Sequence, residues 1–73
     1  MENWDDVRIF LAVARHGGLT AAATSLGINH STVARRLSGL EKGLRTKLVT
    51  RTPAGAVLTS AGQQFLAHAE RIE

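Results

Sequence analysis

The side chains with the clearest chemical character in this sequence are basic, and they gather in its middle third. Residues 29–51 carry six Lys or Arg residues and one acid, a net charge of +5, whereas residues 1–28 and 52–73 each sum to −1. The whole chain has a formal net charge of +3. A positive field concentrated in this way favours a polyanionic partner, because charges kept only for solubility would be spread more evenly.

Small hydrogen-bonding side chains accompany these charges. Arg can pair bidentately with guanine, while Ser and Thr are less selective base readers or phosphate ligands. If the polyanion is DNA, the candidates for contacts to base edges are His30, Ser31, Thr32, Arg35 and Arg36. The candidates for phosphate or groove-edge contacts are Thr20, Lys42, Arg45, Lys47 and Arg51.

The sequence contains no pattern typical of catalysis or of metal binding. His16, His30 and His68 fall in three different predicted elements, and no cysteine is present to supply a thiolate ligand or a disulfide. The glycines lack the surrounding pattern of a phosphate-binding loop. We therefore expect a protein without enzyme activity, cofactor or metal site.

Length and composition indicate one small domain. A chain of 73 residues has no room for a substrate cavity and the shell that would hold a catalytic group, and 44% apolar residues exclude a wholly disordered segment. No apolar run approaches the roughly 20 residues that a membrane-spanning helix needs. The acidic N-terminus is unlike a signal peptide, and the lack of cysteine suits a reducing compartment, so we expect a cytoplasmic domain.

The stretch from Leu19 to Leu40 predicts two short helices joined by a sharp turn. Thr20 is a good N-cap for the first helix, and the three alanines that follow it favour helix. Gly27 stands where the first helix must stop and the chain must reverse. Ile28 is then expected to return to the core.

The second of these helices has one apolar face and one polar face. Asn29 or Ser31 is expected to cap it, and Gly43 to end it, so that it spans about residues 29–42. Its apolar residues recur at spacings of four, three and four, as one helical face requires: Val33, Leu37, Leu40 and Leu44. This arrangement is typical of a helix-turn-helix, although an ordinary helical hairpin with a solvated outer face would share part of the pattern.

A first helix is predicted before this motif. Asn3 is placed to cap it, with Asp6 at the third helical position. The sequence His16-Gly17-Gly18 is expected to end it. Its core-facing residues are expected to be Trp4, Val7, Phe10, Leu11 and Ala14.

The segments after the motif predict a hairpin and a fourth helix. Two β-prone runs, 47–50 and 56–59, flank a turn-forming segment at 51–55, and Leu48 and Leu58 should lean on the helices because an isolated hairpin is marginal. A hairpin in this position is a wing, here residues 47–59. Thr59 or Ser60 is expected to cap the last helix. Its apolar stripe is a candidate dimerisation surface formed by Phe65, Ala69 and Ile72.

Four segments together resemble the N-terminal DNA-binding domain of the LysR-type transcriptional regulators. The first two contain Phe10, Ala12-Val13-Ala14 and Gly18-Leu19-Thr20-Ala21-Ala22-Ala23, then Leu26-Gly27-Ile28, Val33-Ala34-Arg35-Arg36-Leu37 and Leu40-Glu41. The third, Leu48-Val49-Thr50-Arg51, is similar to the family's Leu-Phe-x-Arg. The fourth, Leu58-Thr59-Ser60-Ala61-Gly62, is similar to its Leu-Thr-x-Ala-Gly.

The resemblance implies a mainly α fold. It would be a winged helix-turn-helix with a three-helix core, a two-stranded β-hairpin wing and a C-terminal linker helix, divided into residues 1–59 and 60–73. The resemblance also implies sequence-specific binding of double-stranded DNA by a bacterial transcriptional regulator. The helix at about 29–42 would lie in the major groove, and the wing at 47–59 on the backbone or in the minor groove.

Members of the family bind interrupted palindromic operators as homodimers through the fourth helix. They also carry a C-terminal effector-binding domain, for which this chain has no room. Asn29-His30-Ser31 departs from the family's usual Ser-Gln-Pro or Ser-Gln-Ser, Val49 replaces Phe, and no basic residue lies around Ala54 and Ala56. These departures bear on which base sequence the second helix reads and on how strongly the wing contacts DNA. The alternative function is a winged-helix protein–protein interaction module with an acidic partner.

Overall fold

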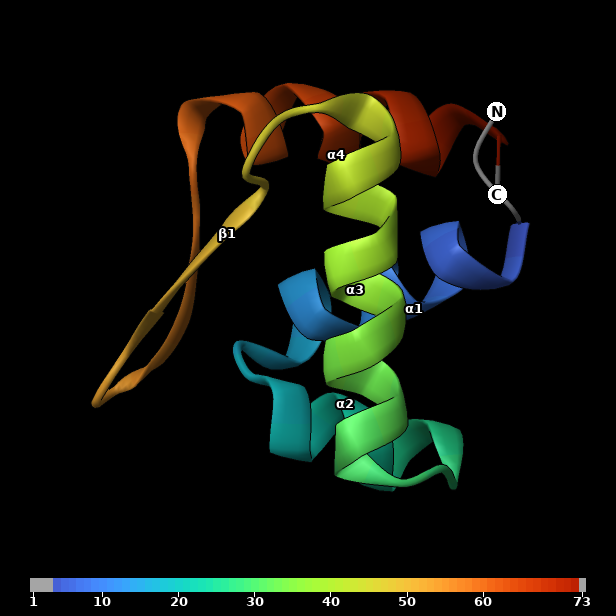
Figure 1. Ribbon diagram of the computed structural model, residues 1–73, viewed down its shortest axis with the longest axis vertical. Coiled ribbons are helices and arrows are strands. Elements are labelled where there is room, and N and C mark those ends of the chain that lie inside the picture. Colours follow the sequence, from blue (N-terminus) through green and yellow to red (C-terminus); the bar gives the residue numbers. More distant parts are fainter. Residues whose placement is uncertain (1–3, 73) are drawn as a thin grey trace.

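The computed structural model describes residues 4–72, and it confirms the predicted winged helix-turn-helix (Figure 1). Three helices come first, a two-stranded antiparallel hairpin follows, and a fourth helix completes the described chain. The predicted helix cap at Asn3 lies outside the described residues. The elements are α1 (Trp4–His16), α2 (Leu19–Leu26), α3 (His30–Leu44), β1 (Val49–Thr52), β2 (Gly55–Leu58) and α4 (Ser60–Ile72).

Helix α1 is the central helix of the domain, with other elements packed on several of its sides. Because α2, α3, α4 and β2 all pack against it, it buries more than the single face predicted: Val7, Ile9, Phe10, Leu11, Ala12 and Val13. The prediction that Trp4 belongs to the core is wrong, since 46% of its surface is exposed. Trp4 is the first residue of α1, and Val7 occupies the buried position one turn later.

Helix α2 begins two residues earlier than the sequence predicts. Its N-cap is Gly18, which has no side chain to cap with, and Thr20 is exposed within the first turn rather than at the cap. Burial of Leu19 draws the start of the helix forward, and Gly17, with φ of 72°, ends α1 directly before it.

The turn between α2 and α3 is closed by Gly27 in the left-handed conformation, with φ of 69°, as predicted. The Ile28 N–H donates to the carbonyl oxygen of Ala23 at 3.1 Å, which completes a tight C-terminal turn. This turn carries Ile28 outward, so its predicted return to the core is wrong and 38% of its surface is exposed. Asn29 then caps α3, because its Oδ1 accepts a hydrogen bond from the Ser31 N–H at 2.8 Å.

Helix α3 buries Val33, Leu37 and Leu40 as the spacing predicts. The prediction that Gly43 ends this helix is wrong, because Leu44 continues the apolar face and stays partly buried. The helix closes at Arg45, whose backbone is left-handed with φ of 56° and ψ of 38°.

The hairpin has a tighter turn than predicted. Thr52 pairs with Gly55, so Pro53 and Ala54 alone form the turn and Arg51 belongs to β1 instead of the turn. Gly55 makes this possible because its φ of 138° is one that other residues rarely adopt. Leu48 is buried and Leu58 packs partly buried against the core, as expected.

Helix α4 starts at Ser60, and Thr59 caps it by accepting the Gly62 N–H at its Oγ1 over 2.9 Å. Phe65 packs edge-on against Phe10, with ring centroids 5.2 Å apart and an interplanar angle of 74°. Ala69 is fully buried beside Val7 and Leu11. Among residues 4–72, no helix is long and apolar enough to cross a membrane.

Candidate nucleic-acid interface

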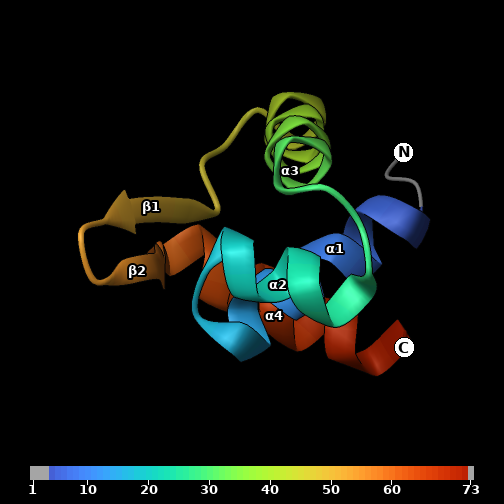
Figure 2. The same cartoon turned by 90° about the horizontal axis from the view of Figure 1, so that it is seen from below.

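One face of α3 is left uncovered by the rest of the domain. In Figure 2 this helix stands at one side of the molecule, and α4 lies on the opposite side. Because the side chains of Val33, Leu37 and Leu40 face inward, helical periodicity turns a polar row outward. The exposed members of that row are Ser31, Arg35, Ser38 and Lys42, with Thr32 half-buried at its edge.

Gly39 leaves the middle of this row without a projecting side chain. A Cβ at this position would meet nothing within 4 Å beyond the adjoining backbone of α3 itself, so the glycine is not needed for packing against other elements. Its absence of a side chain leaves space on the outer surface of α3 instead. A second backbone can approach the helix closely there.

The two neighbouring arginines of α3 occupy different surroundings. Arg35 is exposed on the outward row. Arg36 lies on the flank of the helix, where its Nη1 is 3.4 Å from the Oδ1 of Asp6 on α1. The Arg36 side chain is 41% exposed and that of Asp6 22%. The ion pair with Asp6 therefore competes with any partner for part of the Arg36 guanidinium.

The first turn of α3 and the wing enclose a hollow of ≈ 240 Å³. Three residues predicted separately meet in its lining: Thr20 from α2, His30 from α3 and Arg51 from β1. Its other lining residues carry no charge, and the first amides of α2 lie beside it without a side-chain cap. Free amides at a helix start, together with a cation, favour an anion such as a phosphate.

The opposite end of α3 forms a second basic hollow, of ≈ 430 Å³. Lys42 and Arg45 from the end of the helix and Lys47 from the following loop line it together. All five residues predicted for phosphate or groove-edge contacts thus fall in these two hollows, one at each end of the exposed helix.

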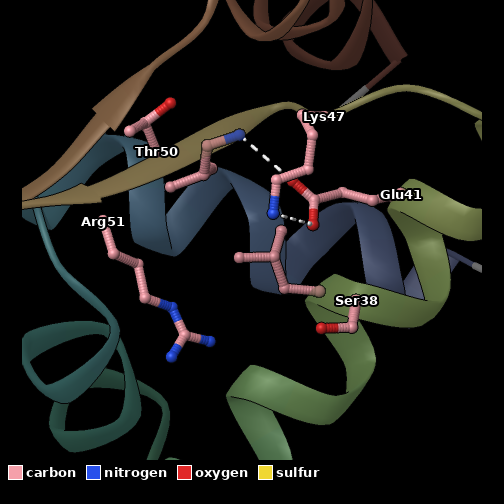
Figure 3. Close-up of a pocket in the computed structure, with 7 residues that line it drawn as sticks. Ser38, Glu41, Lys47, Thr50 and Arg51 are labelled. Carbon is pink, nitrogen blue, oxygen red and sulfur yellow. Dashed lines mark hydrogen bonds and ion pairs between the residues drawn. The ribbon is translucent and has the colours of Figure 1, made fainter.

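A third hollow, of ≈ 250 Å³, lies between α3 and β1 (Figure 3). Ser38 lines it from the helix, and Thr50 and Arg51 line it from the strand. Neither Ser38 nor Thr50 is among the site residues predicted from the sequence. Ser38 could have been found from its place two helical turns after Ser31, whereas nothing in the sequence marks Thr50.

The predicted dimerisation residues are not equally accessible. Phe65 is half-buried against Phe10, and Ala69 is fully covered within the domain. Ile72 remains 51% exposed at the end of α4. Of the three, Ile72 therefore offers a partner the most surface.

Titratable groups do not gather into a metal site in the part of the chain that the structure describes. No group of three or more His, Cys, Asp or Glu side chains comes together within residues 4–72. The ion pairs of this region are mostly at the surface, such as Arg8–Asp5 at 3.9 Å and Arg15–Glu70 at 4.0 Å.

Solved structures similar to this one include DNA complexes. The crystal structure of a CbnR_DBD–DNA complex matches with a TM-score of 0.94 and 35% identity, covering 97% of this chain and 82% of that chain. A BenM_DBD/benA site 1 DNA complex matches with a TM-score of 0.92 and 27% identity, covering 97% and 83%.

Sequence relatives are transcriptional regulators by name. HTH-type transcriptional regulator YofA from Bacillus velezensis is 46% identical over 67 residues, which are 92% of this chain and 23% of that protein. A probable hydrogen peroxide-inducible genes activator from Mycobacterium xenopi is 41% identical over 66 residues, 90% and 35% respectively. The chain therefore spans about a quarter to a third of the length of these relatives.

The profile of one protein family covers most of the chain. It is that of the bacterial regulatory helix-turn-helix proteins, lysR family, and it matches residues 4–63. The matched segment contains α1, both helices of the helix-turn-helix, the wing and the start of α4. With the fold, the exposed α3 and the sequence match in agreement, the chain belongs to the lysR family of bacterial regulatory helix-turn-helix proteins.

Proposed function

We propose that this chain is the sequence-specific DNA-binding domain of a cytoplasmic bacterial transcriptional regulator and that it has no catalytic activity of its own. Helix α3 lies in the major groove, with the wing on the adjacent backbone or minor groove. The observation that carries the proposal is the arrangement of α3, whose outward polar row ends at both sides in a basic hollow. Phosphate contacts at both ends would fix the register of α3 on the duplex, while the row between them reads the base edges.

The residues divide by role according to their positions. Arg35, Ser31 and Thr32 read base edges from the outward row, and His30 joins them at the first turn. Arg36 contributes less, because Asp6 holds its guanidinium. Phosphate contacts come from the two hollows: Thr20, Lys42, Arg45, Lys47 and Arg51.

The DNA site we propose is an interrupted palindrome bound by two copies of the chain. The two copies come together on DNA or through a longer parent protein, with the α4 face around Ile72 as the contact. The DNA-bound CbnR_DBD and BenM_DBD structures support duplex DNA as the partner in preference to an acidic protein.

The test of this function begins with a DNA site selected from a random pool. Arg35→Ala should then weaken binding to that site by about 1–3 kcal/mol and relax the preference at one base pair, because a bidentate base contact is lost. Arg36→Ala should weaken binding by a smaller amount. Arg71→Ala is the matched control, since it removes the same charge from the exposed surface of α4, away from the interface.

Fluorescence anisotropy with the selected and a scrambled duplex measures these affinities, and circular dichroism checks the fold. If Arg35→Ala and Arg36→Ala bind both duplexes as the parent does, α3 is not the reading helix.

A further inference from the structure

Glu41 is the one acid among residues 29–51, where six cations surround it in the sequence. Its side chain is only 11% exposed, at the junction between α3 and the start of β1. A carboxylate on a surface that binds phosphates repels them, so its charge opposes the proposed function. A role for Glu41 in DNA binding must therefore come from its contacts within the domain and not from its charge.

The carboxylate of Glu41 binds the backbone at the start of the wing. Its Oε2 accepts hydrogen bonds from the Leu48 N–H at 2.8 Å and the Val49 N–H at 3.1 Å. Both residues are almost fully buried, at 1% and 3% exposure, so these amides have little access to water. Hydrogen bonds to a charged acceptor are stronger than neutral ones, and a buried amide without a partner is destabilising.

The ion pair of Glu41 with Lys47 contributes less. The Lys47 Nζ is 3.9 Å from the Glu41 Oε1 and its side chain is 77% exposed, so water screens the attraction (Figure 3). The two backbone hydrogen bonds are therefore the main link that Glu41 makes between α3 and β1.

The other anchors of the hairpin lead to different elements. The Ala56 N–H donates to the Gly17 carbonyl oxygen at 2.9 Å, which ties β2 to the turn before α2. The Thr59 hydroxyl donates to the Lys47 carbonyl oxygen at 2.7 Å, which ties the start of α4 to the loop before β1. Glu41 supplies the tie to α3, the helix proposed to enter the major groove.

Arg51 depends on this tie through the geometry of the strand. It follows Val49 by two residues on β1, so the two side chains point to the same face of the hairpin. Val49 is buried against the core, and Arg51 extends from the strand into the hollow beside α3 (Figure 3). A shift of β1 at Val49 therefore moves the Arg51 guanidinium relative to the base-reading row.

We propose that Glu41 is a positioning residue, which sets the distance and angle between the recognition helix and the wing so that α3 and Arg51 engage DNA together. This inference rests on the proposed DNA binding. It predicts a change in DNA affinity on substitution of Glu41 that is opposite in sign to the change expected from net charge alone. Removing the Glu41 side-chain acceptor weakens specific binding, whereas the loss of one negative charge by itself would strengthen it.

The experiment is a double-mutant cycle in the 73-residue chain, measured by fluorescence anisotropy on the selected duplex. Glu41→Ala should weaken binding about five- to tenfold in the parent and less than twofold in the Arg51→Ala background, because residues that act through one another are not additive. Glu41→Gln should stay within about threefold of the parent, since a single amide oxygen can accept both N–H groups. Glu70→Ala on α4 is the control for the change in net charge.

A fold that is disturbed throughout would lower binding equally in both backgrounds of the cycle, and that result would overturn the inference. Glu41→Ala binding as tightly as the parent, or more tightly, would do the same. If Glu41→Ala does not fold, Glu41→Asp replaces it, because it keeps the charge but is one methylene too short to hold both amides. If Arg35→Ala and Arg51→Ala leave binding unchanged, the proposed function has failed rather than this role of Glu41.

Discussion

Arg45 is the residue at which backbone conformation and side-chain charge favour different amino acids. Among residues 4–72 it is the non-glycine residue with positive φ, at 56°, and it closes α3 through N–H bonds to Glu41 and Lys42 carbonyl oxygens. Glycine is preferred at this position of a helix end because it has no Cβ. The side chain of Arg45, however, lines the basic hollow with Lys42 and Lys47. The strain is thus located in the proposed interface, as is common for functional residues.

Arg45→Gly should therefore stabilise the fold and weaken DNA binding. Relief of the left-handed strain is worth about 1–2 kcal/mol, and the greater freedom of glycine in the unfolded chain offsets about 0.4–1 kcal/mol of it. We expect a gain of up to about 1.5 kcal/mol in the free energy of unfolding. Urea unfolding and anisotropy measure the two effects separately.

Arg45→Ala is the matched control for this prediction, because it removes the charge but keeps the strained backbone. It should weaken DNA binding as much as Arg45→Gly without the gain in stability. A glycine variant that binds with the parent's affinity would show that Arg45 makes no phosphate contact.

Single residues are also where the sequence predictions were least accurate. Thr20 has the side chain of a good N-cap, yet burial of Leu19 places the cap at Gly18. Ile28 is apolar, yet the tight turn closed by Gly27 turns it outward. For Thr20 the burial of Leu19 outweighs a cap preference of about 1 kcal/mol, and for Ile28 the geometry of the turn outweighs its apolar character.

At the scale of elements, the wing is bonded both to α3 and to the turn before α2, so it is not a free hairpin. Its strands pair in the register Val49–Leu58 to Thr52–Gly55, and β2 is bonded to the turn before α2. A Cβ at Gly55 would press against the Gly17 carbonyl oxygen, so the two chains approach as closely as glycine permits. Arg51 is therefore presented on a supported strand.

Lys47→Ala and Arg51→Ala should weaken binding to all DNA sequences alike. Each should lower the slope of log affinity against log salt by about 1, because each loss leaves one phosphate with its counterions. The ion pair of Lys47 with Glu41 is long, at 3.9 Å, and Lys47 is 77% exposed, so Lys47 can exchange this pair for a phosphate. Anisotropy titrations at four or more salt concentrations measure the slopes.

The two outcomes of these titrations separate the wing from the helix. Unchanged slopes for both variants would place the wing outside the interface while leaving the reading role of α3 intact. A loss confined to one sequence would instead make Arg51 a base reader, contrary to its assignment.

The order and type of the elements could be predicted from the sequence because apolar spacing and turn residues determine them. The face Val33–Leu37–Leu40 and the stop at Gly27 were both correct. Convergence of side chains from separate elements could not be predicted. The meeting of Thr20, His30 and Arg51, and the bonds from Glu41 to β1, depend on how the hairpin packs against the helices. A lone acid in a basic segment was nevertheless a visible signal.

At the scale of the whole molecule, α4 serves the domain's own core first. Phe65 packs on Phe10, and Ala69 is covered by Val7 and Leu11. What α4 leaves for a partner is centred on Ile72 near the end of the helix. Such a surface is far below the roughly 1,200 Å² of a stable standard complex, and helix ends also fray.

We therefore expect the 73-residue chain to be a monomer or weak dimer at micromolar concentration and to dimerise on a DNA with two half-sites. The DNA holds both copies at a high effective concentration, so a weak contact suffices. Sedimentation equilibrium with and without the two-half-site duplex measures both states. A tight dimer in the absence of DNA, lost in a folded Ile72→Asp variant, would contradict this expectation.

Leu48 joins three elements through its backbone. Its N–H is held by Glu41 of α3, its carbonyl oxygen accepts the Thr59 N–H at 3.0 Å, and Gly62 of α4 lies so close that a Cβ would overlap that oxygen. These contacts leave the Leu48 peptide little room to move relative to α3 or α4. A displacement of α4 at Gly62 would therefore press on the Leu48 peptide, which leads into the wing on one side and is bonded to Glu41 of α3 on the other.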